Sequence, residues 1–315
     1  MVTTPTETPE AVKSGRPARR IQFRLADAAD YLFVLPAVLF LAVFLVYPIL
    51  YNVRLSFIQV TASDLLSGSV AFVGLKNYQE IFQDPLTRLA ALNTLTFTVA
   101  SLFFQIVISM ALAVLYRQTF PGSRLMRSLY LAGWAVPVLV SGTVFKWLFD
   151  GDSGLVNYAL RLIGLSSAPL FWTADQGLAL TSTVIANIWL GIPFNLALLY
   201  AALQTIPREL YEAAAIDGAK AWSRFFRITL PLIKPALLST LILGMIYTVK
   251  QFELIWTMTQ GGPLNSSQVV STAAYTYTFG QFEFGHGAAL LNLTALFLFG
   301  ATLLYLRSIG REGTA

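Results

Sequence analysis

The stretch around which the rest of this chain is arranged reads EAAAIDG over residues 212–218 and continues as ITLP over residues 228–231. It is a charged, helix-prone segment that lies between two long apolar runs. Alanines at 213 and 214 leave one helix face without bulk, so that this face can approach another surface closely. Gly218 can adopt the positive φ that ends a helix. The stretch therefore predicts a helical hairpin built to meet a partner.

The flanking residues predict where each helix of the hairpin lies. The first helix is expected from Arg208 to Asp217, with Glu209 and Glu212 near the positive end of the helix dipole. The second is expected from about Ala219 to Thr229. Leu230-Pro231 is expected to end it, and Pro235 to start the next apolar segment.

A second interpretation of the hairpin places it flat on anionic lipid headgroups. Lys220, Arg224 and Arg227 lie along one side of the second helix and fit that interpretation. The interpretation does not explain the paired alanines or the glycine, and we therefore favour docking on a protein.

The composition points to lipid as the solvent. Of 315 residues, 56% are hydrophobic and 12% are charged, whereas soluble domains carry about 25% charged residues. Cysteine is absent and histidine occurs once, which disfavours thiolate or histidine metal sites and cysteine nucleophiles. A net charge of +5 is typical of a membrane protein with basic cytoplasmic loops. Nucleic-acid binding is disfavoured, because the sequence shows no basic stripe interleaved with exposed aromatic residues.

Hydrophobic segments predict an all-α integral membrane protein with six transmembrane helices. Each segment is long enough to cross about 30 Å of hydrocarbon. Residues 1–25 are expected to form a disordered basic tail, and residues 26–315 one transmembrane domain. The first segment is too long for a signal peptide and is expected to be an uncleaved anchor. The predicted spans are about 31–53, 89–116, 126–149, 178–204, 235–259 and 287–307.

Lysine and arginine counts predict the orientation. With both termini inside, fifteen basic residues lie on the cytoplasmic side and five on the other, with Lys250 inside a span. Because basic residues accumulate in cytoplasmic loops, both termini and the hairpin are expected to be cytoplasmic.

The sequence lacks the common motifs for nucleotide hydrolysis, nucleophilic catalysis and zinc-dependent catalysis. There is no phosphate-binding GxxxxGK[ST] loop, no GxSxG elbow and no HExxH helix. No catalytic residue and no metal ligand is predicted. The energy for any transport is therefore expected to come from a partner or from an ion gradient.

The hairpin residues resemble the signature loop of ABC importer permeases, EAA-x3-G-x9-I-x-LP, at every fixed position. The chain resembles permease subunits of type I ABC importers in the carbohydrate-uptake group, over nearly all of residues 31–307. Further stretches that carry this resemblance are FVGLKNY at 72–78, Asn93-Thr94, WLGIPF at 189–194, Phe252-Glu253, TQGGP at 259–263 and Phe282 with Gly285, Gly287, Ala288 and Ala289. The FVGLKNY and TxGGP stretches favour the first-subunit type.

This resemblance implies a set of partners. They are a second homologous permease, a pair of ABC ATPase subunits that bind ATP and Mg, and an extracytoplasmic solute-binding protein in a bacterial or archaeal cytoplasmic membrane. No cofactor is expected on this chain. The hairpin then acts as the coupling helix, and Glu212 pairs with a basic residue of the ATPase. The coupling residues implied are Glu212, Ala213, Ala214, Asp217, Gly218, Ile228, Leu230 and Pro231.

Polar residues in the apolar segments are candidates for the substrate pathway. Gly191 and Pro193 can interrupt the fourth span and free backbone carbonyls. Asn187 and Asn195 can bind sugar hydroxyls, or equally can bond to neighbouring helices. Lys250 and Glu253 can pair within the fifth span, either along the route or, as we favour, near the outer interface. The full candidate set is Asn187, Gly191, Asn195, Tyr247, Lys250 and Glu253.

The sequence thus predicts an ABC importer permease that takes up a sugar or sugar-like solute. An ion-coupled secondary transporter is the main alternative, although such proteins ordinarily carry more acidic residues inside the membrane. A membrane scaffold without transport is a third.

Overall fold

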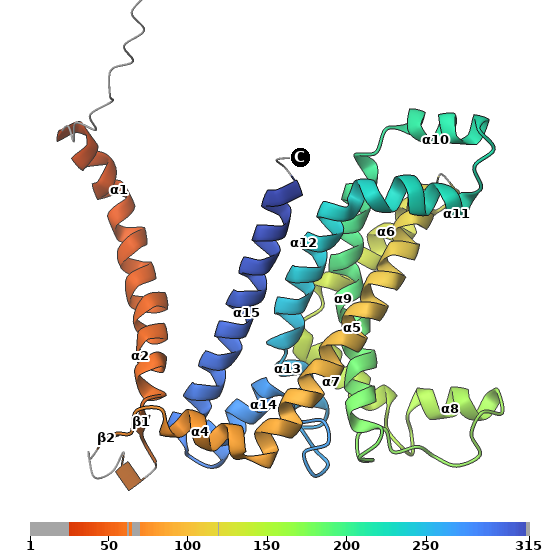
Figure 1. The fold of residues 1–315 in the computed structure, drawn as a ribbon. Coiled ribbons are helices and arrows are strands. Elements are labelled where there is room, and N and C mark those ends of the chain that lie inside the picture. The colour runs from red at the N-terminus through yellow and green to blue at the C-terminus, as the bar shows by residue number, and fades with distance from the viewer. Residues whose placement is uncertain (1–24, 62, 65–69, 119, 313–315) are drawn as a thin grey trace, which may run out of the picture. The chain divides into compact units, whose positions relative to one another are not determined.

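A computed structural model describes residues 25–61, 63–64, 70–118 and 120–312. The chain divides into two units between Leu50 and Tyr51. The predicted basic tail over 1–25 lies outside the described residues, except for Leu25. The described residues are overwhelmingly helical (Figure 1). They contain five helices that are long and apolar enough to cross a membrane, or six if one bent pair counts as a span.

The first unit consists of α1 (Leu25–Leu41), η1 (Ala42–Val46) and the start of α2 (Tyr47–Leu55). Its side chains over 32–50 are all exposed, as expected for a helix surrounded by lipid. The π-helical η1 ends two residues before Pro48, where Tyr47 N–H bonds to Ala42 O. A π-turn at this place widens the backbone ahead of a residue that donates no N–H, so that the helix continues through the proline.

The second unit begins with a small β-ribbon that leads into the helices. β1 (Ile58–Gln59) pairs antiparallel with β2 (Ala71–Phe72), with Ile58 opposite Phe72. The short α4 (Lys76–Gln83) follows and turns directly into α5.

The core of the second unit forms where α5 (Pro85–Arg117) packs along α9 (Ala179–Gln204), with α12 (Leu230–Val249) against both. Fully buried Ala113, Leu196, Leu199 and Leu203 meet there beside Ile233. Burial of these apolar side chains fixes the three helices relative to one another. α9 is a continuous helix, so the predicted interruption at Gly191 and Pro193 is wrong. A single proline removes one hydrogen bond, and packing against α5 on the same stretch holds the helix together.

The predicted third span is broken. α6 (Ser123–Ala132) and η2 (Gly133–Ala135) meet α7 (Val138–Leu148) at a bend of 103°. Val136 is extended and Pro137 follows it. Because a residue before proline is disfavoured in the helical region, the break has a local cause.

The predicted fifth span over 235–259 is also two helices. α12 ends at Val249, and α13 (Glu253–Met258) is a separate helix packed on α7 and α9. Leu254 and Ile255 are fully buried there. Gly142 of α7 permits the contact, since a Cβ at that position would lie 3.0 Å from Thr257 Cβ.

The remaining elements complete the second unit. α14 (Val270–Tyr275) and η4 (Thr276–Gly280) lead to the long α15 (Phe284–Glu312). The short α8 (Leu155–Leu162) lies between α7 and α9 in sequence, at the end of the unit opposite α10 (Figure 1). Its buried Asn157 fastens the surrounding loop through Gly151 O at 2.8 Å, Leu170 O at 2.9 Å and the Trp172 indole at 3.0 Å.

Candidate functional site

A pocket of about 260 Å³ opens between α5, the α6–α7 bend, α9 and α12. We call it the solute pocket. Its floor and walls combine amide side chains with aromatic rings. Its lining residues are Gln105, Gly133, Trp134, Val136, Val138, Asn187, Leu190, Gly191, Phe194, Asn195, Gly244, Tyr247, Thr248 and Gln251.

Four of the six predicted pathway residues line this pocket: Asn187, Gly191, Asn195 and Tyr247. The other two do not. Lys250 follows the end of α12 and lines a different groove with Phe252 and Tyr275. Glu253 begins α13. The predicted ion pair within one helix is therefore wrong, because the chain leaves the helical conformation between the two residues.

Polar contacts tie α5 to α9 at the base of the pocket. Gln105 Nε2 donates to Asn187 O at 2.8 Å, and Asn195 Nδ2 donates to Gln105 Oε1 at 3.2 Å. Gly191 faces the same amide, and a Cβ there would lie 2.2 Å from Gln105 Cδ. Glycine at 191 is therefore required for Gln105 to reach α9.

Three buried polar atoms around the pocket have no hydrogen-bond partner: Asn187 Nδ2, Asn195 Oδ1 and Gln251 Nε2. Asn187 and Asn195 are 5% and 1% exposed. Such groups are costly to bury unsatisfied. Two of these atoms are hydrogen-bond donors and one is an acceptor.

The sequence prediction missed Gln105, Trp134, Thr248 and Gln251 as lining residues. Gln105 left a signal, because it is a polar residue in the middle of an otherwise apolar span. Trp134 left none. Only the bend between α6 and α7 brings it beside Phe194, at 5.7 Å between ring centroids.

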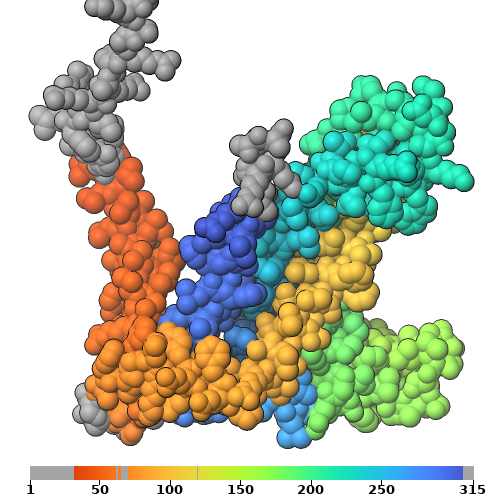
Figure 2. All heavy atoms as spheres, in the orientation of Figure 1, coloured from red at the N-terminus to blue at the C-terminus, as the bar shows by residue number. Residues whose placement is uncertain are grey.

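The hairpin over residues 208–231 stands at one end of the second unit (Figure 2). α10 (Arg208–Ile216) is followed by a turn at Gly218, whose φ is +74°. Gly218 N bonds to Ala215 O and Ala219 N to Ala214 O, so the last carbonyls of α10 are satisfied as the chain reverses. Ile216, at 88% exposed, projects from the tip.

One side of α10 is held by the helices beneath it. Tyr211 Oη pairs with Thr229 Oγ1 at 2.8 Å, and the Arg117 guanidinium lies 4.3 Å from the Tyr211 ring centroid. Arg117 also donates to Ile206 O at 3.3 Å. These contacts connect α10 to α5 and to η3, and they connect α5 to the segment between α9 and α10.

The second helix of the hairpin does not end at Leu230-Pro231 as predicted. α11 (Ala221–Arg224) continues through η3 (Phe225–Thr229) into α12 as one helix over 221–249. Leu230 N bonds to Phe225 O in a π-turn. This is the same arrangement as at Pro48: the π-turn precedes the proline by two residues and lets the helix pass through it.

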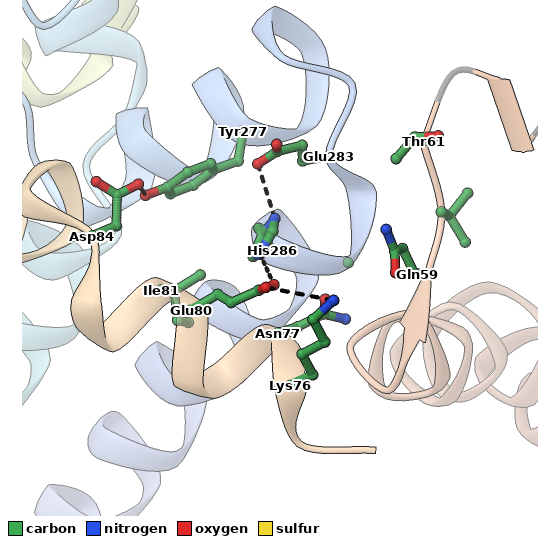
Figure 3. A pocket seen from close by; sticks show the side chains of 12 residues that line it. Gln59, Thr61, Lys76, Asn77, Glu80, Ile81, Asp84, Tyr277, Glu283 and His286 are labelled. Atoms are coloured by element: carbon green, nitrogen blue, oxygen red, sulfur yellow. Dashed lines mark hydrogen bonds and ion pairs between the residues drawn. The ribbon is translucent and has the colours of Figure 1, made fainter. Parts of the chain in front are cut away.

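A second polar pocket, of about 300 Å³, is lined largely by residues of α4 and of the start of α15 (Figure 3). α4 lies at the end of the unit opposite the hairpin (Figure 1). His286 of α15 stands between two carboxylates. Its Nε2 is 3.0 Å from Glu80 of α4, and its Nδ1 is 2.9 Å from Glu283. His286 thus joins the start of α15 to α4.

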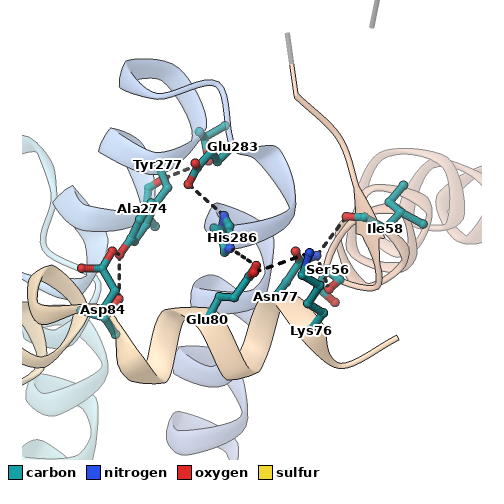
Figure 4. A network of polar contacts seen from close by, with 12 residues as sticks. Ser56, Ile58, Lys76, Asn77, Glu80, Asp84, Ala274, Tyr277, Glu283 and His286 are labelled. Atoms are coloured by element: carbon teal, nitrogen blue, oxygen red, sulfur yellow. Dashed lines mark hydrogen bonds and ion pairs between the residues drawn. The ribbon is translucent and has the colours of Figure 1, made fainter. Parts of the chain in front are cut away.

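A buried tyrosine continues this network (Figure 4). Tyr277 donates its hydroxyl hydrogen to Asp84 and pairs with Thr87 Oγ1 at 2.9 Å. Burial, followed by the bond to Asp84, raises the pKa of the Tyr277 phenol well above its usual range. The phenol therefore remains a hydrogen-bond donor throughout the physiological pH range. Among the described residues no group of three His, Cys, Asp or Glu is placed to hold a metal ion.

Residues 105–309 match the model of the family described as binding-protein-dependent transport system inner membrane component. The chain belongs to this family. It is therefore a multi-pass transport subunit of the inner membrane, and the predicted resemblance to sugar-uptake permeases is confirmed by its relatives.

Curated relatives match this permease over most of their length. The diacetylchitobiose uptake system permease protein of Streptomyces coelicolor is 33% identical, over 95% of this chain and 92% of the relative. The trehalose/maltose transport system permease protein of Thermococcus litoralis is 32% identical, over 93% and 96%. The sn-glycerol-3-phosphate transport system permease protein of Yersinia pestis is 32% identical, over 90% and 94%.

Solved structures confirm the predicted fold class. A bacterial ABC transporter involved in the import of the acidic polysaccharide alginate aligns with a TM-score of 0.78, at 22% identity, over 91% of this permease and 96% of that chain. At this identity the similarity shows the shared fold.

Three sequence stretches of the family resemblance have structural roles in this permease. Asn77, from FVGLKNY, donates to Ser56 O and Ile58 O, both at 2.9 Å (Figure 4). Gly285 lies against the same amide, since a Cβ there would be 2.5 Å from Asn77 Nδ2. Asn93 donates to Gln268 O at 2.9 Å and fixes the loop after α13 to α5.

Proposed function

We propose that this permease is the first of two homologous permeases in an ABC importer for a sugar or sugar-like solute. The solute passes the solute pocket, and the hairpin couples the pocket to a partner ATPase that binds ATP and Mg. The hairpin carries the proposal, because it matches the family's signature loop and its α10 is an anchored helix with an exposed tip.

The anchoring of α10 supports a mechanical route to the pocket. α10 is tied to α5 through Arg117 and to the helix over 221–249 through Thr229, and it follows α9 after three residues. The same three helices supply Gln105, Asn195 and Thr248 to the pocket. Rigid helices transmit displacement along their length, so a push on α10 shifts the pocket walls relative to one another.

The pocket itself supports passage of a polyhydroxylated solute. Hydroxyl groups donate and accept, and can therefore pair with the unsatisfied amide atoms of Asn187, Asn195 and Gln251. The exposed Trp134 and Tyr247 rings offer apolar faces to the C–H surface of a sugar ring. A few convergent polar groups within an apolar wall are typical of small-molecule sites.

Membrane orientation follows from the charge distribution. We place both termini and the hairpin in the cytoplasm, because basic residues on that side outnumber those on the other by fifteen to five. The ends of the helices near α8 and His286 then face the extracytoplasmic solute-binding protein.

Affinity purification of the tagged chain from its native membrane tests the partner set. We expect a P-loop ATPase and a second six-span permease to co-purify, and ATP-dependent sugar uptake after reconstitution with the binding protein. Recovery of the chain alone, or uptake that persists without ATP and collapses with the proton gradient, would support a secondary transporter instead.

The coupling role is tested by the double variant Glu212→Ala, Gly218→Pro. Proline cannot adopt φ of +74° and removes the N–H that bonds to Ala215 O, so the turn after α10 cannot form. We expect loss of the co-purifying ATPase with normal membrane insertion.

Gly164→Pro is the matched control. Gly164 has φ of +72°, donates to Arg161 O at 3.1 Å as Gly218 does to Ala215 O, and stands in open space at the other end of the unit. This variant is expected to retain the ATPase. Unchanged uptake by the Glu212→Ala, Gly218→Pro variant contradicts the coupling role.

A further inference from the structure

Among the described residues that line the solute pocket, none has a side chain that is ionised at neutral pH. Its polar lining consists of amide side chains, the Thr248 hydroxyl, the Tyr247 phenol and the Trp134 indole N–H, and the rest is apolar or glycine. The relatives' names do not decide the charge of a solute, since one names a diacetylated sugar and another a phosphate ester. The pocket of this chain gives a more specific answer.

The unsatisfied atoms around the pocket are of both kinds. Asn187 Nδ2 and Gln251 Nε2 donate, whereas Asn195 Oδ1 accepts. A hydroxyl can satisfy either kind. A phosphate, sulfonate or carboxylate only accepts, and beside Asn195 Oδ1 it would meet a second acceptor.

Burial of an anion in this pocket would lack a counter-ion. A charge taken out of water is costly unless a cation or several charge-assisted hydrogen bonds replace the water. One cation lies close to a lining residue: Lys250 Nζ is 5.4 Å from the Tyr247 ring centroid. It is directed over that ring and lines the separate groove with Phe252 and Tyr275.

The aromatic side of the pocket favours a neutral ring. Trp134, Phe194 and Tyr247 form a row with centroids 5.7 and 5.6 Å apart. Trp134 and Tyr247 are each more than half exposed. Aromatic faces carry negative electrostatic potential, which repels an anion and attracts polarised C–H groups.

We propose that the solute pocket selects an uncharged saccharide and discriminates against solutes that carry phosphate, sulfonate or carboxylate. The inference rests on the proposed transport function and adds the charge class of the solute. Asn187, Asn195 and Gln251 are the specificity-determining residues, with Trp134 and Tyr247 as the sugar platform.

Saturation-transfer NMR on the purified permease–ATPase complex in lipid nanodiscs tests this selectivity without the binding protein. The two probes are maltose and maltose 1-phosphate, which differ by one phosphate. We expect saturation transfer to maltose, and an affinity for maltose 1-phosphate weaker by about tenfold or more, because the phosphate must be buried unpaired. Equal or stronger binding of maltose 1-phosphate overturns the inference.

A gain of function provides the second measurement. Gln251→Lys places an ammonium at one of the unsatisfied amides and is expected to shift the preference towards maltose 1-phosphate. Gln251→Met is the matched variant, because methionine has a similar length and no charge. It is expected to weaken the binding of maltose without strengthening the binding of maltose 1-phosphate. Retention of the ATPase and of a single elution peak shows that both variants are folded.

The remaining outcomes also decide the question. If maltose 1-phosphate binds well and Lys250→Gln abolishes that binding, Lys250 supplies the counter-ion and the inference fails. If neither probe binds to a complex whose ATPase still responds to its binding protein, the proposal that the pocket is a saccharide site is also overturned. A chain that purifies without an ATPase instead contradicts the proposed function, before any sugar is added.

Discussion

At the scale of single residues, close approach at Gly191 determines how α5 and α9 meet. The Gln105 amide occupies the place of the missing side chain and bonds across to α9. Any larger residue at 191 displaces that amide and leaves buried polar atoms without partners. The same amide also defines the base of the solute pocket.

Gly191→Ala is therefore expected to destabilise the permease. Overpacking, together with the loss of the Gln105 bonds, should cost about 1–3 kcal/mol. The measurement is the apparent unfolding midpoint of the purified complex by tryptophan fluorescence at a fixed scan rate. Gly300→Ala is the control, because a Cβ at 300 meets nothing within 4 Å and alanine favours the helix. Equal midpoints for the two variants would contradict this account of Gly191.

At the scale of elements, the start of α5 is fixed by an N-cap at Asp84, to which a residue distant in sequence also bonds. Asp84 Oδ1 accepts from Leu86 N at 2.8 Å, and Pro85 occupies the first turn. Tyr277 of η4 donates to the other carboxylate oxygen. The cap follows from local sequence, whereas the tyrosine reaches Asp84 only in the folded chain.

Asp84→Ala is expected to fray the first turn of α5 and to loosen η4. Loss of the cap and of the partner of a buried phenol should cost about 1–3 kcal/mol. Hydrogen exchange of the backbone amides over 86–90 measures the effect. Asp84→Asn keeps an acceptor for Leu86 N and should protect these amides more than Asp84→Ala does. Identical exchange in the two variants would show that the cap does not hold this turn.

At the scale of the whole molecule, the two functional regions lie at different levels of the second unit. The hairpin lies at one end, with α4 and α8 at the other (Figure 1). The solute pocket opens between α5, the α6–α7 bend, α9 and α12. Such an arrangement suits a solute path whose walls move when one end is pushed.

Single-cysteine labelling tests the orientation, and the chain has no native cysteine to interfere. Ile216→Cys in the hairpin and Leu165→Cys after α8 replace residues that are 88% and 73% exposed. A membrane-impermeant maleimide applied to intact cells should label the cysteine at 165 and not the cysteine at 216. After the membrane is permeabilised, both should react. The reverse pattern in intact cells would place the hairpin outside.

The sequence predicted a large part of the fold and part of the site. Apolar length identified the membrane helices, because a lipid solvent demands about 20 apolar residues per span. The turn at Gly218 was readable, since only glycine adopts its φ without strain. Asn187, Asn195, Gly191 and Tyr247 were singled out and share one pocket.

The structure departs from the sequence prediction at two prolines. Val136-Pro137 is a local signal for the bend in the third span, because a residue before proline disfavours the helical conformation. Pro231 does not end its helix, because the π-turn ahead of it relieves the clash between the proline ring and the preceding turn.

By itself, then, the sequence determined the membrane class, the hairpin and the family, because these depend on composition and on short-range pattern. The tertiary structure alone decided the rest. No proline or glycine marks the break at 250–252; it exists because α13 buries Leu254 and Ile255 against α7 and α9. The solute pocket likewise depends on five elements meeting, so that Gln105, Trp134 and Gln251, distant in sequence, surround one space. Burial free energy is gained only between segments that have come together, and sequence periodicity does not record which segments these are.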